Sequence, residues 1–123
     1  MLFIDKVFFY GTLKSDGIFY PMFEKYVVYN FPGYVFGGLY EYKNRPVFVT
    51  DRKDKIIGEI VTLSNTRRFF NIVDSIEYYL TRIETTVYYK ENDHPVKAYI
   101  YKFENVNNEP LTLIESGVWN NKK

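Results

Sequence analysis

Six segments with the composition of β-strands are distributed along this chain, and several of them are apolar at consecutive positions. A strand with one face in water alternates apolar and polar residues, whereas these segments carry apolar or aromatic residues for both faces. Glycines inside the longest segment favour sharp curvature. The pattern predicts a strongly curved sheet that closes toward a small barrel. The predicted strands are Lys6–Tyr10, 33–42, 47–49, 56–63, 82–90 and 96–103.

Turn-like sequences separate these strands. Lys43-Asn44-Arg45 precedes Pro46, and residues 50–54 are predicted to form a charged turn between two strands. The segment 91–95, which holds His94, is predicted to be the tip of a hairpin. The tail, residues 120–123, is expected to fray.

The composition fits one folded domain over residues 1–123. Hydrophobic residues make up 46% of the chain, too many for a disordered protein. The 16 Lys and Arg residues nearly balance the 15 Asp and Glu residues, giving a formal net charge of +1. Such a surface lacks the electric field that attracts proteins to nucleic acid or anionic membranes, so we expect neither partner. The start, Met1–Lys6, is predicted to be a first strand and not a signal peptide, and a cytoplasmic location is expected.

Two missing residue types restrict the chemistry. The chain has no cysteine, which excludes a thiol nucleophile, a redox pair and any Cys-ligated metal. Its single histidine, His94, lies in a polar turn, so a His-rich zinc site is excluded by number. If the chain is an enzyme, its proton transfers fall to carboxylate, tyrosine or lysine side chains.

The segment Phe9-Tyr10-Gly11-Thr12-Leu13 is the first candidate site. A buried strand there ends in a glycine turn, which leaves backbone amides at the strand end. Converging N–H groups of this kind bind anions. An ordinary turn explains the same residues, and the local sequence leaves both interpretations open.

Two helices are predicted beside the sheet. One covers 19–29 with an early Pro21. The other is capped by Ser64 or Asn65 and shows an apolar stripe over Phe69, Ile72, Val73 and Ile76.

Glu77 follows the apolar stripe of the second helix. At 100° per residue it points to the edge of that stripe, whereas Asp74 points toward solvent. A carboxylate directed into apolar surroundings has a raised pKa, as a proton shuttle at neutral pH requires. If the helix ends before Glu77, this residue is an exposed surface acid, and both interpretations stay open.

These segments together resemble the γ-glutamylcyclotransferase-like family, which includes the plant avirulence-induced proteins and small microbial relatives. The resemblance covers nearly the whole chain. It rests on Tyr10-Gly11-Thr12-Leu13, Gly38-Leu39-Tyr40 with Pro46, Gly58-Glu59-Ile60, Asp74-Ser75-Ile76-Glu77, Arg82 and Ile114–Trp119. The chain departs from the family where Tyr78-Tyr79 follows Glu77 in place of the usual glycine, and where Ser15-Asp16-Gly17 follows the loop.

The resemblance implies an α+β fold, a small twisted mixed β-barrel with one or two flanking helices. It also implies a cofactor-free cyclotransferase that converts a γ-glutamyl amine or peptide to 5-oxoproline and free amine. For the matching positions of this sequence, the resemblance implies that Glu77 is the catalytic acid/base. It also implies that the glutamyl group of the small-molecule substrate is bound by Tyr10, Gly11, Thr12 and Leu13. The alternative is a non-catalytic module that binds a small carboxylate or a protein partner on the same fold. A third interpretation, a single-stranded nucleic-acid binder, would require strongly salt-dependent binding.

Three other residues have structural interpretations. Glu59 is predicted to form a cross-strand salt bridge. Arg67 and Arg68 are predicted to lie on a solvated helix face. Trp119 is expected to cap the barrel or to anchor the tail.

Overall fold

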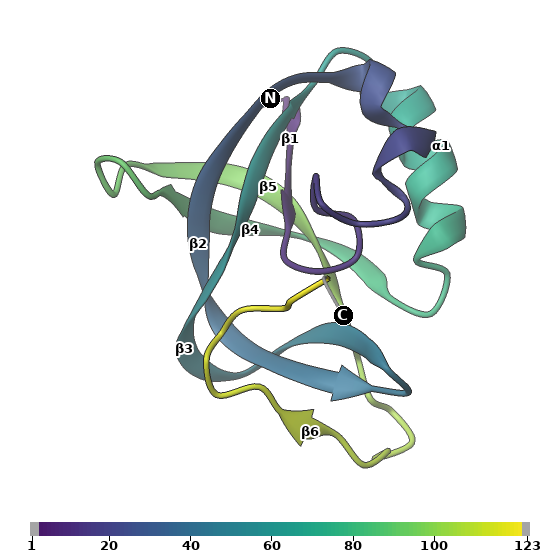
Figure 1. Ribbon diagram of the computed structural model, residues 1–123, viewed down its shortest axis with the longest axis vertical. Helices are drawn as coiled ribbons and strands as arrows, with labels where there is room; N and C mark the ends of the chain where they lie inside the picture. The colour runs from purple at the N-terminus through teal and green to yellow at the C-terminus, as the bar shows by residue number, and fades with distance from the viewer. Residues whose placement is uncertain (1–2, 122–123) are drawn as a thin grey trace.

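The computed structural model describes residues 3–121 and shows a β-barrel with one α-helix packed on its side (Figure 1). The α+β fold and the barrel predicted from the sequence are confirmed. No helix within the described residues is long and apolar enough to cross a membrane. The elements in chain order are β1 (Lys6–Phe9), η1 (Tyr20–Met22), η2 (Glu24–Tyr26), β2 (Val27–Tyr42), β3 (Arg45–Leu63), α1 (Thr66–Ile76), β4 (Thr81–Tyr89), β5 (Pro95–Lys102) and β6 (Thr112–Leu113).

Strand pairing closes the barrel. β1 pairs antiparallel with β3, β3 with β2, β2 with β4, and β4 with β5. A parallel pairing between β5 and β1, at Val7 and Tyr99, completes the ring and makes the barrel mixed. β6 adds a short pairing to the end of β2. The closed ring buries the inward-facing side chains of its strands.

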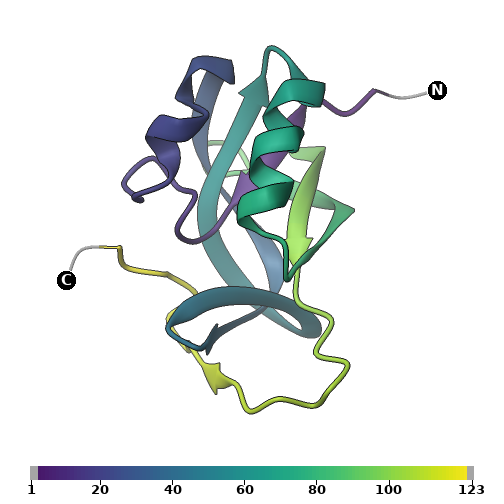
Figure 2. The same cartoon turned by 90° about the vertical axis from the view of Figure 1, so that its right-hand side faces the viewer.

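The two faces of the barrel wall bury two different clusters. On β1, Phe8 points into the barrel interior, where it joins Ile60 and Ile100. Val7 and Phe9 point the other way, into a cluster under the helices. Figure 2 shows α1 and the two 3₁₀ helices side by side over this part of the wall. A strand between two apolar compartments has no face left for polar residues, and this accounts for the continuous apolar run in β1.

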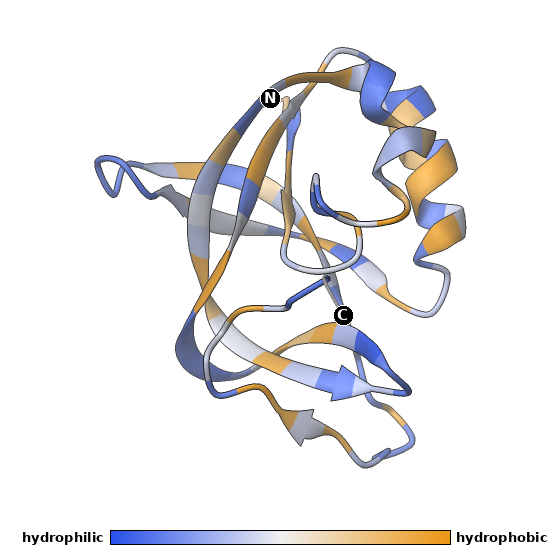
Figure 3. Ribbon diagram, viewed as in Figure 1, coloured by the Kyte–Doolittle hydropathy of each residue, from blue (hydrophilic) through white to orange (hydrophobic). Residues whose placement is uncertain are grey.

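β2 and β3 form one long, bent hairpin. It turns at Lys43 and Asn44, which both have positive φ and form a two-residue turn of the type that matches strand twist. The separate strands predicted at 47–49 and 56–63 are parts of β3, so the turn predicted at 50–54 is wrong. Gly37 pairs with Asp54 and Gly38 with Val49, so residues 50–53 bulge out of the ladder without ending the strand. Figure 3 shows hydrophobic and hydrophilic residues mixed along both strands.

The helix predicted at 19–29 is also wrong. The chain forms the short η1 and η2 there and enters β2 at Val27. Pro21 lacks an N–H group, and β-branched Val27 and Val28 favour the strand that pairs with the end of β3. Phe23 is fully buried and contacts Phe69 of α1 edge to face, so packing holds this segment without a regular helix.

Both ends of the chain differ from expectation. Met1 and Leu2 lie outside the described residues, and residues 3–5 precede the first strand, with Phe3 exposed. At the other end, residues 122–123 lie outside the described part. Asn121 does not fray but bonds to the loop after β1. Trp119 packs against the barrel cluster, as expected.

Candidate active site

Glu77 is buried at the end of α1, although the helix stops one residue before it. Asn65 caps the helix start by accepting a 3.1 Å hydrogen bond from the Arg68 N–H. At the other end, the Glu77 N–H donates to the Val73 carbonyl at 2.9 Å, so the backbone of Glu77 continues the hydrogen-bond pattern of the helix. Glu77 is only 5% exposed, the one buried charged residue among those described. Although the helix ends before Glu77, the side chain of Glu77 is therefore not an exposed surface acid.

Burial decides the acidity of Glu77. Removal from water disfavours the carboxylate and raises its pKa from 4.5 to about 7, against the opposing effect of the Arg45 charge. At neutral pH both protonation states are then populated. A group with this property can take up a proton and release it again, as acid/base chemistry requires.

Arg45 was missed by sequence reasoning. Its Nη2 lies 3.2 Å from Glu77 Oε1, and its guanidinium lies over the rings of Tyr79 at 4.7 Å and Phe19 at 5.8 Å. Arg45 opens β3 directly after the hairpin turn, and a turn position gave no sign of a contact 32 residues away. The only available signal was indirect, because a buried carboxylate generally requires a cationic partner.

Glu77 and the loop after β1 line the same pocket. Gly11, Thr12 and Leu13 form one side of it, and Pro46 closes it beside Glu77. The pocket has ≈ 260 Å³ of empty space including its open mouth, but the centre of a water-sized sphere can occupy only ≈ 20 Å³. That is room for about one ordered water, so only the end of a ligand enters this space. The remainder of a ligand must extend into the mouth.

The loop that lines this pocket carries backbone N–H groups without a partner among the described residues. Within residues 3–121, no acceptor is found for the N–H groups of Gly11, Thr12 and Leu13. The loop itself is closed by hydrogen bonds from Lys14 N–H to the Gly11 carbonyl at 3.1 Å and from Gly17 N–H to the Lys14 carbonyl at 2.8 Å. Donors that are held in place and lack an acceptor suit a carboxylate or a developing oxyanion.

Tyr10 occupies a different position from the rest of the loop. Its hydroxyl donates to the Tyr101 carbonyl at 2.8 Å and accepts from the Phe48 N–H at 3.1 Å. Burial raises the pKa of this hydroxyl, and the nearby Glu77 charge adds to the shift. Through its hydroxyl, Tyr10 therefore links the end of β1 to β3 and β5. Tyr10 is also one of the residues that line the pocket.

Glu59 holds the outer half of the loop, and the predicted salt bridge is wrong. Its carboxylate accepts from the Ser15 N–H at 2.8 Å, the Ser15 hydroxyl at 2.6 Å and the Asn30 side chain at 3.1 Å. The C-terminal tail adds a second tie, because Asn121 donates to the Gly11 carbonyl at 3.1 Å. The loop is thus fixed from two sides.

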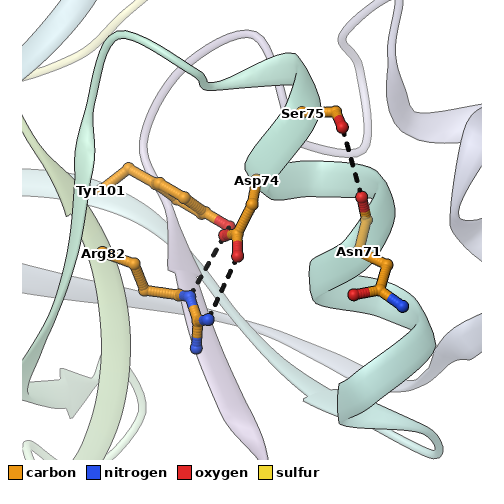
Figure 4. Close-up of polar contacts among 5 residues, drawn as sticks. All are labelled: Asn71, Asp74, Ser75, Arg82 and Tyr101. Carbon is orange, nitrogen blue, oxygen red and sulfur yellow. Dashed lines mark hydrogen bonds and ion pairs between the residues drawn. The ribbon is translucent and has the colours of Figure 1, made fainter.

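Asp74 joins the end of α1 to the barrel (Figure 4). It accepts a 2.5 Å hydrogen bond from the buried Tyr101 hydroxyl and two bonds, at 3.2 and 3.1 Å, from Arg82. The Arg82 guanidinium in turn lies 4.0 Å from the Phe70 ring centre. Asp74 is partly exposed, as predicted, but these hydrogen bonds hold its carboxylate in place. It precedes Glu77 by three residues. The contact fixes the last turn of the helix, from which Glu77 projects.

Other predicted residues lie outside the pocket. Arg67 and Arg68 are exposed, as predicted. His94 lies in the exposed turn between β4 and β5. Within the described residues, no group of three or more His, Asp or Glu side chains could hold a metal ion.

Comparison with known proteins gives a family and a fold. A protein-family model described as "Gamma-glutamyl cyclotransferase, AIG2-like" matches residues 7–121. No curated protein matches the chain significantly.

Several solved structures share the fold. An AIG2-like protein of Mus musculus superposes with a TM-score of 0.74 at 17% identity, covering 99% of this chain and 98% of that one. An uncharacterized protein of Pyrococcus horikoshii gives a TM-score of 0.68 at 18% identity, covering 92% and 87%. YkqA of Bacillus subtilis gives 0.75 at 19% identity, covering 95% of this chain and 40% of that one. At these identities the similarity shows the fold alone.

Proposed function

Because the chain belongs to the gamma-glutamyl cyclotransferase, AIG2-like family, we propose that it is a cofactor-free cyclotransferase. It converts a γ-glutamyl amine or peptide to 5-oxoproline and a free amine. One observation carries the proposal: Glu77, whose burial raises its pKa to about 7, lines a small pocket together with three loop residues whose backbone N–H groups have no acceptor within residues 3–121. The family match supports a cyclotransferase-like role, and the pocket supports the roles of its residues.

The nucleophile in this reaction is the substrate's own α-amine. Its nitrogen attacks the γ-carbonyl carbon, so the C–N bond of the five-membered ring forms and the C–N bond to the leaving amine then breaks. No serine, cysteine or metal is required. Intramolecular attack in a held pose can correspond to an effective molarity on the order of 10⁵ M or more, so positioning supplies much of the rate.

Glu77 moves the proton. As a carboxylate it accepts a proton from the α-ammonium group or from the attacking nitrogen. As a carboxylic acid it then donates that proton to the leaving nitrogen. A pKa of about 7 serves both directions at neutral pH, because neither protonation state is strongly favoured.

The loop holds the glutamyl group. The N–H groups of Gly11, Thr12 and Leu13 donate to the substrate carboxylate or to the oxyanion that develops on the γ-carbonyl. Glu59 and Asn121 keep these donors in place by tying the loop from outside. Tyr10 supports the loop through its two buried hydrogen bonds.

The proposal is tested by turnover. The purified protein is incubated with a panel of γ-glutamyl amino acids and γ-glutamyl amines, and 5-oxoproline is measured by mass spectrometry. Glu77→Gln preserves the shape of the side chain and removes its proton chemistry, so we expect product formation to fall at least about 100-fold. Glu84→Gln makes the same change at an exposed position on β4 and should leave the rate unchanged.

The alternative is a binding module on the same fold. The ion pair between Arg45 and Glu77 favours it, because a carboxylate held by a guanidinium is less available as a base. Calorimetric binding of γ-glutamyl compounds without 5-oxoproline, at any pH between about 6 and 9, would decide for this alternative.

A further inference from the structure

Arg45, which precedes the pocket residue Pro46 and contacts Glu77, has unused hydrogen-bonding capacity. A guanidinium carries five N–H donors, and among the described residues a single hydrogen bond is found for this one, to Glu77. The side chain of Arg45 is 30% exposed, whereas that of Glu77 is 7% exposed. The guanidinium therefore lies on the solvent side of the carboxyl, with donors left for a second partner.

Two aromatic rings hold the guanidinium in place. Tyr79 lies 4.7 Å and Phe19 5.8 Å from the Arg45 Cζ atom. Contact with aromatic faces favours the cation and limits the side chain to few conformations. A planar donor that is already oriented suits a carboxylate, which it can bind through two parallel hydrogen bonds.

The reaction places a specific substrate atom beside Glu77. The leaving nitrogen must come within hydrogen-bond distance of the Glu77 carboxyl to receive its proton. When the leaving group is an α-amino acid, its carboxylate is only two bonds from that nitrogen. Phe8, Phe9 and Tyr101 of the barrel wall line the pocket, so a leaving group too large for the pocket extends away from that wall. The guanidinium 3.2 Å from Glu77 lies within reach there.

We propose that Arg45 binds the carboxylate of the leaving amino acid, which makes γ-glutamyl-α-amino acids the preferred substrates over γ-glutamyl amines without that carboxylate. This inference rests on the proposed function and adds its substrate class.

A matched pair of substrates tests the assignment. γ-Glutamyl-L-alanine and γ-glutamylethylamide differ only by the carboxylate on the leaving group. We expect kcat/KM of the wild type to favour the alanine compound about 10- to 100-fold, the range of a charge-assisted hydrogen bond. Arg45→Gln should bring this ratio close to one, and Arg45→Lys should leave an intermediate ratio. Arg52→Gln, on the same strand but at the exposed bulge, should keep the wild-type ratio.

The ratio separates the possible roles of Arg45. A change in Glu77 acidity affects both substrates equally and cancels, so an Arg45→Gln variant that loses both activities in proportion overturns the inference. A wild-type ratio near one also overturns it, and the proposed function survives in both cases.

Absence of 5-oxoproline from both substrates means that the proposed function fails, and calorimetry then decides about Arg45. Tighter wild-type binding of the alanine compound, lost in Arg45→Gln, supports the carboxylate site. Equal affinities, or no binding of either compound, overturn it.

Discussion

Gly11 lies directly against Pro46: a Cβ atom built on Gly11 would be 2.3 Å from Pro46 Cγ. The first residue belongs to the loop after β1 and the second to the start of β3, so this contact joins the two sides of the pocket. Gly11 is not among the described residues with positive φ, so its backbone does not itself require glycine. The requirement comes from the neighbouring ring, not from the close approach of a ligand.

Gly11→Ala should therefore destabilise the protein through a steric clash. We expect a loss of about 1–3 kcal/mol in the free energy of unfolding, because a proline ring cannot rotate away as a flexible side chain can. Pro46→Ala removes the clashing Cγ and leaves a Cβ at 3.1 Å. Urea denaturation should show that Gly11→Ala costs less in the Pro46→Ala background. Equal costs in both backgrounds would mean that the two residues do not interact.

The pKa of Glu77 predicts how stability depends on pH. Since the folded state raises this pKa from 4.5 to about 7, the folded protein binds more protons than the unfolded chain between those values. The free energy of unfolding therefore falls as pH rises across this window, by on the order of 3 kcal/mol at about 1.4 kcal/mol per unit. The Glu77→Gln variant has no titrating group at position 77 and should lack this contribution to the decline.

The measurement is the difference in unfolding free energy between wild type and Glu77→Gln at about pH 5 and pH 8. The variant should be relatively more stable at the higher pH, and Glu84→Gln should show no such change. A difference that stays constant with pH would show that the folded Glu77 titrates as an ordinary acid.

Asp74 should stabilise the end of α1 by accepting a hydrogen bond from the buried Tyr101 hydroxyl. Asp74→Ala leaves that hydroxyl without its acceptor and Arg82 without its partner. We expect a cost of about 1–3 kcal/mol from the hydroxyl, with little from the ion pair, because Asp74 is 46% exposed. In a Tyr101→Phe background the cost of Asp74→Ala should fall below about 1 kcal/mol. Chemical denaturation of the four proteins measures this coupling.

Glu59 should control the mobility of the loop after β1. Its carboxylate holds the Ser15 N–H at 2.8 Å, and Glu59→Ala removes that acceptor. Hydrogen exchange of the Ser15 amide, followed by NMR, should become at least about 10-fold faster, since local opening no longer breaks a charge-assisted hydrogen bond. Glu84→Ala is the matched control on another strand. Unchanged exchange in Glu59→Ala would show that Glu59 does not limit the mobility of the loop.

Strand-forming segments were predictable because their apolar pattern is local. Val7 and Phe8 are neighbours in sequence, and a run without polar positions requires two apolar surroundings, here the barrel interior and the space under α1. The predictions failed where pairing overrode local signals. Residues 50–54 were predicted to form a turn, but the parts of β3 on either side of the bulge stay paired with one continuous β2.

The candidate site divides in the same way. The glycine loop and the position of Glu77 beside an apolar stripe follow from spacing along the chain. Other contacts of the site could not be predicted, because they join segments that are far apart in sequence. These are the ion pair of Arg45, the hydrogen bonds from the loop to Glu59 and Asn121, and the contact of Gly11 with Pro46.

By itself the sequence determined a curved, two-sided apolar sheet, an amphipathic helix and the two groups that could carry the chemistry. Tertiary structure alone decided that these groups share a pocket and that a guanidinium lies beside the carboxyl. The reason is physical: acidity depends on distance from water and from other charges, and folding sets both distances.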